Sequence, residues 1–133
     1  VLVNMFLNAS QAMEASGVIT VFLERVLYDP ASTYRQNANR FHRGDSLITV
    51  SVIDQGEGID EETQERIFDP FFTTKEPGSG TGLGLSVSDK IIDGFLGAID
   101  VHSRKGEGAT FTILLPEAKP QAEQSEEPQA APA

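Results

Sequence analysis

Four segments of alternating polarity constrain the fold of this chain most strongly. Each is rich in β-branched residues and places apolar and polar side chains in turn, which is typical of a strand with one buried face. The four predicted strands are residues 18–27, 46–54, 98–103 and 109–115. A long polar segment, residues 28–45, separates the first two, and we expect it to be a loop.

Helical periodicity marks other segments of the chain. In residues 2–13 and 83–95 apolar side chains recur at steps of three and four, so each is expected to form an amphipathic helix, the first ending near Ser16–Gly17. A shorter helix is predicted from Asp60 to Phe68, with Asp60 as N-cap and two glutamates in its first turn. One sheet layered against helices is the economical way to bury these apolar faces.

The chain has room for a single domain followed by a tail. Its 133 residues are enough for one hydrophobic core. Residues 116–133 hold four of the seven prolines and no aromatic or β-branched residue, so we predict a disordered acidic tail there. Residues 1–115 are therefore the predicted folded domain.

Composition narrows the possible functions. The chain contains no cysteine, which excludes disulfides, thiolate nucleophiles and cysteine-ligated zinc. A net charge of −10 would repel nucleic acids and anionic lipids, so neither is an expected partner, and an anionic ligand would need a metal ion beside it. Because no apolar stretch is long enough to cross a bilayer, the chain is expected to be soluble and cytoplasmic.

The segment Asp54–Asp60, DQGEGID, follows the second predicted strand directly. Gly56 and Gly58 allow the backbone to approach a ligand closely or to adopt a positive φ, and Asp54 is placed to accept a hydrogen bond from an exocyclic amine. Glycines at the third and fifth positions exclude an EF-hand calcium loop, which needs oxygen ligands there. A glycine turn without a ligand is the alternative interpretation, and the motif alone does not decide between the two.

Glycines recur at alternate positions in Gly78–Ser86, GSGTGLGLS, where the last predicted helix begins. Backbone N–H groups of such a loop and the N-terminus of the helix both point at an anion, so the segment favours phosphate binding. Its spacing fits neither the dinucleotide fingerprint nor the P-loop and indicates a third phosphate geometry. A flexible linker is the alternative, although Leu83 and Leu85 between the glycines favour a continuing helical face.

Polar side chains elsewhere complete the candidate site. Asn4 and Asn8 lie one helical turn apart and so share one helix face. A neutral amide oxygen ligates Mg²⁺ without cancelling its charge, although two solvated asparagines are the simpler interpretation of the pair alone. Lys75 precedes the glycine-rich segment and is placed to meet a phosphate. The phenylalanines of Ile67–Lys75, IFDPFFTTK, are equally compatible with a core role.

Taken together and in this order, the segments resemble the ATP-binding catalytic domain of sensor histidine kinases, within the ATPase superfamily shared with gyrase and MutL. VLVNMFLNASQAM is similar to the family's N box, DQGEGID to its first glycine box, IFDPFFTTK to its F box and GTGLGLSVS to its second glycine box. PFFTTK followed by GTGLGL resembles the nitrogen-regulatory subtype. The likeness extends from Val1 to Pro116, where GEGATFTILLP matches the closing strand.

The resemblance implies an α+β fold of the Bergerat type. Such a fold is a two-layer sandwich with a mixed, mostly antiparallel sheet, helices on one face and a mobile ATP lid, here residues 70–82. ATP and Mg²⁺ are the implied cofactors, with Asn8 as the Mg²⁺ ligand and Asp54 bonded to the adenine amino group. The other residues implied to contact the nucleotide are Gly56, Gly58, Ile59, Phe68, Lys75, Gly80, Thr81, Gly82, Leu83 and Gly84.

The resemblance also implies the reaction and the partners. A sensor histidine kinase passes the γ-phosphoryl group of Mg·ATP to a histidine on a separate dimerisation domain, and then to an aspartate of a response regulator. Asn4 stands where the superfamily's hydrolases carry a glutamate base, so transfer to histidine is favoured over attack by water. Asn4, Asn8 and Lys75 are the catalytic candidates. An ATPase switch and a non-catalytic interaction module are the alternatives.

Three departures from the family pattern accompany the resemblance. The chain contains no phosphoacceptor motif, so alone it is expected to be an inactive, monomeric fragment of a kinase whose parent can be membrane-anchored. It begins within the N-box helix, and a preceding strand expected of the family is missing, so we expect an exposed sheet edge. Ala109 stands where a nucleotide-contacting threonine is common.

Overall fold

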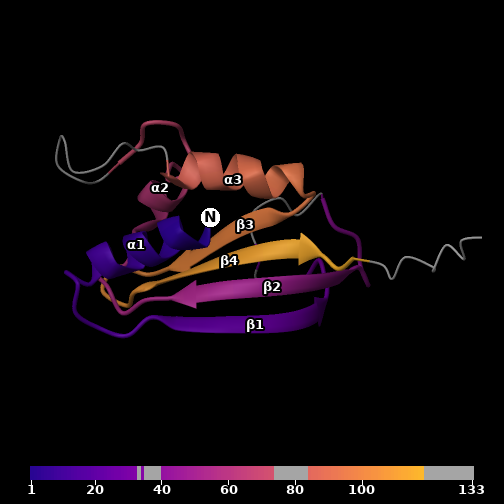
Figure 1. The fold of residues 1–133 in the computed structure, drawn as a ribbon, viewed down its shortest axis with the longest axis horizontal. Coiled ribbons are helices and arrows are strands. Elements are labelled where there is room, and N and C mark those ends of the chain that lie inside the picture. Colours follow the sequence, from indigo (N-terminus) through magenta and orange to yellow (C-terminus); the bar gives the residue numbers. More distant parts are fainter. Residues whose placement is uncertain (33, 35–39, 74–83, 119–133) are drawn as a thin grey trace, which may run out of the picture.

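In the part of the chain that the structure describes, three helices lie on one face of a four-stranded sheet (Figure 1). The structure is a computed structural model and describes residues 1–32, 34, 40–73 and 84–118. The helices are α1 (Leu2–Ala12), α2 (Glu61–Gln64) and α3 (Gly84–Gly94), and the strands are β1 (Thr20–Leu27), β2 (Ser46–Ile53), β3 (Ala98–Ser103) and β4 (Ala109–Pro116). The predicted α+β class is therefore confirmed. Within the described ranges, no helix is long and apolar enough to cross a membrane.

β4 lies between β2 and β3 in a sheet whose strand order is β1-β2-β4-β3. The three pairings are all antiparallel. Phe111 of β4 pairs with Val52 of β2 on one side and with Val101 of β3 on the other, so a single register brings these three side chains to the helix-covered face. β1 forms one edge of the sheet, and its side chains are exposed along almost the whole strand.

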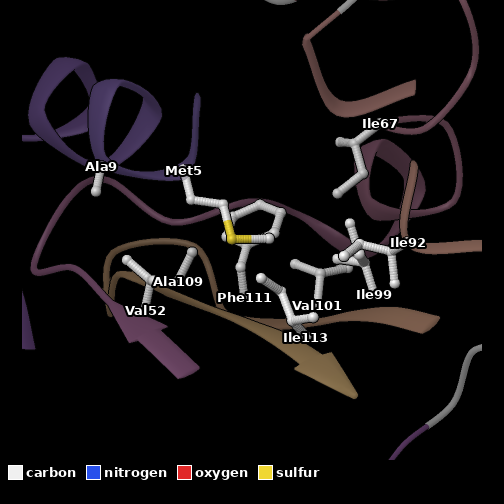
Figure 2. Close-up of a cluster of buried hydrophobic side chains, with 10 residues drawn as sticks. All are labelled: Met5, Ala9, Val52, Ile67, Ile92, Ile99, Val101, Ala109, Phe111 and Ile113. Atoms are coloured by element: carbon white, nitrogen blue, oxygen red, sulfur yellow. The ribbon is translucent and has the colours of Figure 1, made fainter. Parts of the chain in front are cut away.

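The main core fills the space between the helices and the sheet (Figure 2). Met5 points from α1 toward the sheet, and the strand residues meet it with every second side chain. The buried members of this core are Met5, Ala9, Val52, Ile67, Ile92, Ile99, Val101, Ala109, Phe111 and Ile113. These positions match the apolar faces of the predicted amphipathic helices and strands, which is why periodicity alone predicted the layers.

The opposite face of the sheet is partly covered by the segment between β1 and β2. Tyr28 and Phe41 of this segment pack on apolar side chains of β2, β3 and β4, with their ring centroids 5.5 Å apart. Arg40 binds the carbonyl of Gly97 and the carboxylate of Asp93, and so joins the segment to the end of α3. The predicted loop is thus bound to the fold through its described residues.

Helix α2 is shorter than predicted, although its start is as expected. The carboxylate of Asp60 accepts a hydrogen bond from the backbone N–H of Thr63 at 2.7 Å, which is an N-cap. Beyond Gln64 the backbone forms turns closed by hydrogen bonds between residues three apart, in which the N–H of Arg66 donates to the carbonyl of Thr63 and that of Asp69 to the carbonyl of Arg66. This tighter winding leaves Ile67 in the core. α1 is also shorter than predicted, since Glu14 adopts a left-handed backbone conformation soon after Ala12.

The Asp60 N-cap makes the stability of the fold depend on pH. The hydrogen bonds from Thr63 hold the pKa of the Asp60 carboxyl below its usual range. A carboxyl with a lowered pKa in the folded state stabilises the fold above its unfolded pKa of about 3.9, and this contribution is lost as the pH falls through the lower, folded pKa.

We therefore expect Asp60→Ala to lower the urea midpoint at pH 7, and the difference from the wild type to shrink steadily below about pH 4. Asp60→Asn keeps an oxygen acceptor and serves as the control, with most of the midpoint retained at pH 7. Urea denaturation followed by circular dichroism between pH 2 and 7 measures both. A difference that does not change with pH would contradict the role of the ionised cap.

Candidate nucleotide-binding site

One face of α1 connects the two glycine-rich segments of the sequence. Asn4, Asn8 and Ala12 follow one another at helical spacing. At one end the amide of Asn4 donates to the carbonyl oxygen of Gly84 at 3.4 Å, where α3 begins. At the other end Ala12 lies against Gly56, where an added Cβ would stand 2.8 Å from the Ala12 Cβ. Asn8, which is half-buried, therefore lies between the start of α3 and the loop after β2.

Asp54 is a buried carboxylate at the end of β2, with 6% of its surface exposed. Its Oδ1 accepts hydrogen bonds from the backbone N–H of Gly56 at 2.8 Å and of Ala109 at 3.2 Å. Its own N–H donates to the carbonyl of Ala109 at 2.9 Å. Among the described residues, both hydrogen bonds to the Asp54 side chain go to Oδ1, so Oδ2 is the oxygen with capacity for a ligand's N–H group, as adenine recognition requires.

The two glycines of the DQGEGID loop are required by backbone packing. Gly58 has φ +72°, and a Cβ there would stand 2.0 Å from the carbonyl oxygen of Arg104 in the β3–β4 hairpin. Gly56 is closed off in the same way by Ala12 of α1. The glycine turn that the sequence left open as an alternative is thus present, and contact of these glycines with a nucleotide stays a prediction.

Ile59 and Phe68 are half-buried and pack against the main core. Each has one side in the core and part of its surface exposed, so the predicted contact of these side chains with the nucleotide also stays a prediction. The two residues flank α2 in the sequence, Ile59 shortly before the helix and Phe68 shortly after it.

Most of the predicted phosphate-binding residues lie outside the described part of the chain. These are Lys75, Gly80, Thr81, Gly82 and Leu83, together with most of the predicted lid. Gly84 is described: it is the first residue of α3, and a Cβ there would stand 3.7 Å from the Asn4 side chain. The second glycine box therefore runs into the N-terminus of an eleven-residue helix, and this N-terminus lies beside Asn4 of α1.

The β3–β4 hairpin is the part of the site that the sequence did not predict. A Cβ at Gly108, which has φ +76°, would stand 2.2 Å from the carbonyl oxygen of Asp54. Ser103 and Gln64 bind the DQGEGID loop through side-chain hydrogen bonds. The closely spaced glycines Gly106 and Gly108 were the available signal, because they mark a hairpin that another backbone approaches.

Comparison with known proteins assigns the family. Residues 1–119 match the family described as histidine kinase-, DNA gyrase B-, and HSP90-like ATPase. The chain belongs to this family. Membership implies that it binds ATP. The signal transduction histidine-protein kinase AtoS of Escherichia coli (strain K12) is 43% identical over 116 residues, which cover 87% of this chain and 16% of AtoS.

Solved structures agree with this assignment. The catalytic domain of the histidine kinase ThkA is 34% identical, with a TM-score of 0.62 over 89% of this chain and 65% of that one. Full-length ShkA, solved in complex with AMPPNP, is 27% identical with a TM-score of 0.59, over 90% of this chain and 22% of that one. The chain therefore has the fold of a histidine kinase catalytic domain and spans a small part of its full-length relatives.

The packing at Gly58 generates a stability prediction. We expect Gly58→Ala to destabilise the chain by more than the roughly 1–2 kcal/mol that a left-handed conformation costs a residue with a Cβ, since its methyl group also meets the Arg104 carbonyl. Gly44→Ala is the matched control, because Gly44 has φ +87° and nothing within 4 Å of an added Cβ. Urea denaturation measures both, and equal losses would contradict the close approach of the hairpin.

Proposed function

We propose that this chain binds Mg·ATP and presents its γ-phosphate to a histidine on a separate dimerisation domain, from which the phosphoryl group passes to a response-regulator aspartate. The arrangement that carries the proposal is the stripe of Asn4, Asn8 and Ala12 on one face of α1, which runs from the start of α3 to the loop that Asp54 begins. The names of its relatives AtoS and ThkA, which are histidine kinases, and the AMPPNP bound to ShkA, support it.

Asp54 is the residue we assign to adenine. Its Oδ2 would accept a hydrogen bond from the amino group, while the N–H donors of Gly56 and Ala109 hold Oδ1 in place. A buried acceptor without its partner is costly, so this carboxylate discriminates against bases that offer no donor at this point. Ala109 contributes its backbone here, and its side chain belongs to the core.

Asn8 is the residue we assign to Mg²⁺. Asn8 is half-buried and lies between the loop that Asp54 begins and the N-terminus of α3. Its neutral amide oxygen suits an ion that keeps several of its waters and neutralises phosphates. When bound, Mg²⁺ would screen the charge of the transferring phosphoryl group. The N-terminus of α3 offers N–H groups and a positive dipole end to the same phosphates, with Lys75 as the proposed further cation.

Asn4 favours a kinase over a hydrolase. Its amide donates to Gly84 and lies 3.5 Å from the hydroxyl of Ser88, and an amide has no basic oxygen to take a proton from water. The γ-phosphate would then persist until a stronger nucleophile, such as an imidazole, is aligned with it.

Binding is the first test of the proposal. In calorimetric titrations with ADP and a non-hydrolysable ATP analogue, we expect magnesium-dependent binding by the wild type. Asp54→Asn should raise the Kd at least about tenfold, because an NH₂ group replaces Oδ2 and cannot accept a hydrogen bond from the adenine amino group. Asn8→Ala should remove most of the magnesium dependence. Asp45→Asn, the same change on the loop before β2, should bind normally. A folded wild type that binds neither nucleotide would overturn the proposal and favour an interaction module.

Turnover separates the kinase from the ATPase switch. We expect the wild type to hydrolyse ATP very slowly, and Asn4→Glu to raise the rate at least about tenfold, since a positioned general base contributes about 10²–10⁴-fold. Asn4→Gln restores no base and is the control. Phosphate release measured at saturating Mg·ATP gives the rates. Rapid hydrolysis by the wild type that Asn8→Ala abolishes would contradict the kinase assignment.

A further inference from the structure

The loop between β2 and α2 needs external support to hold a shape. Two of its residues are glycines, which lose the most conformational freedom on folding. Its first residue, Asp54, is anchored to Ala109, the first residue of β4. Its far end, at Ile59, has a different anchor, which lies at the end of β3.

Ser103 provides that anchor with a single hydroxyl group. The Ser103 Oγ accepts a hydrogen bond from the backbone N–H of Ile59 at 2.8 Å. The same hydroxyl donates to the carbonyl oxygen of Gly108 at 2.6 Å. The hydroxyl thus uses its proton on the hairpin and a lone pair on the loop. Gly108 directly precedes Ala109, so both ends of the loop are connected to the same short stretch of backbone at the start of β4.

Gln64 reinforces this connection from α2. Its side-chain amide donates to the carbonyl oxygen of Ile59 at 2.7 Å and to that of Ser103 at 3.0 Å. The backbone of Gly106 also donates to the carbonyl of Glu57 at 2.6 Å. The loop is therefore held against the hairpin along its length, at a distance so short that Gly58 has no room for a Cβ.

We propose that Ser103 is a positioning residue for adenine recognition: its hydroxyl fixes Ile59 and the hairpin together, so that Asp54 meets the adenine amino group in one defined orientation. This inference rests on the proposed function, because it concerns the same nucleotide site. Ser103 acts through the loop and needs no contact with the nucleotide. Removal of its hydroxyl breaks the hydrogen bonds to the Ile59 N–H and to the Gly108 carbonyl together, while the Asp54 side chain itself is unchanged.

The test compares adenine with guanine in each variant. We expect Ser103→Ala to raise the Kd for ADP about tenfold and to reduce the ratio of ADP to GDP affinity by a similar factor, since an unfixed loop selects the base less well. Ser103→Thr keeps the hydroxyl and should restore both. Ser51→Ala is the matched control, because it removes a half-buried serine hydroxyl that bonds Thr112 at 2.9 Å on the other face of the sheet.

A second variant covers the case in which Ser103→Ala does not fold. Gln64→Ala leaves the Ser103 hydroxyl in place and removes the two hydrogen bonds that the Gln64 side chain donates. It should shift the ratio of ADP to GDP affinity in the same direction by a smaller factor. Faster hydrogen exchange of the Ile59 amide in either variant would support the role directly. Unchanged ADP affinity and selectivity in the folded variants, with a wild type that binds ADP, would overturn this inference alone. A wild type that binds no ADP would overturn it together with the proposed function.

Discussion

The contact between the end of β2 and the start of β4 is the interaction on which the rest of the site depends. Asp54 and Ala109 exchange backbone and side-chain hydrogen bonds there. Because β4 also pairs with β3, one strand fixes both the carboxylate and the hairpin beside it. The orientation of Asp54 is thereby set before any ligand arrives, and a preorganised group loses little conformational freedom when it binds.

Close backbone packing explains why the loop after β2 is rich in glycine. Gly56 meets α1, Gly58 meets the β3–β4 hairpin, and Gly108 meets Asp54, each at a distance that excludes a side chain. These contacts bring three elements to one point, where the stripe of Asn4 and Asn8 also ends. A glycine turn and a ligand loop are therefore compatible interpretations, since the packing is what positions the acceptor.

Periodicity and β-branched composition predicted the positions of the helices and strands, although β1 is exposed along almost its whole length and has no buried face of its own. The length of α2 was not predictable, since it ends where the chain must place Ile67 in the core. Packing of Tyr28 and Phe41 on the sheet is a tertiary contact that local polarity does not reveal. Asp54 and Asn4 of the site belong to recognisable sequence motifs and could be predicted. Ser103 could not, because it is a single serine at a strand end and Ile59, which donates to it, lies 44 residues away in the sequence.

The most direct test is a map of backbone amide shifts in a ¹⁵N-labelled sample titrated with ADP and Mg²⁺. The largest shifts are expected at Gly56, Asn8 and Gly84, which lie on or against α1 on the helix side of the sheet. Little change is expected at Thr49 and Thr112, which are buried on the other side. Shifts confined to that other side, or none at saturating nucleotide, would contradict a nucleotide site between Asp54 and the start of α3.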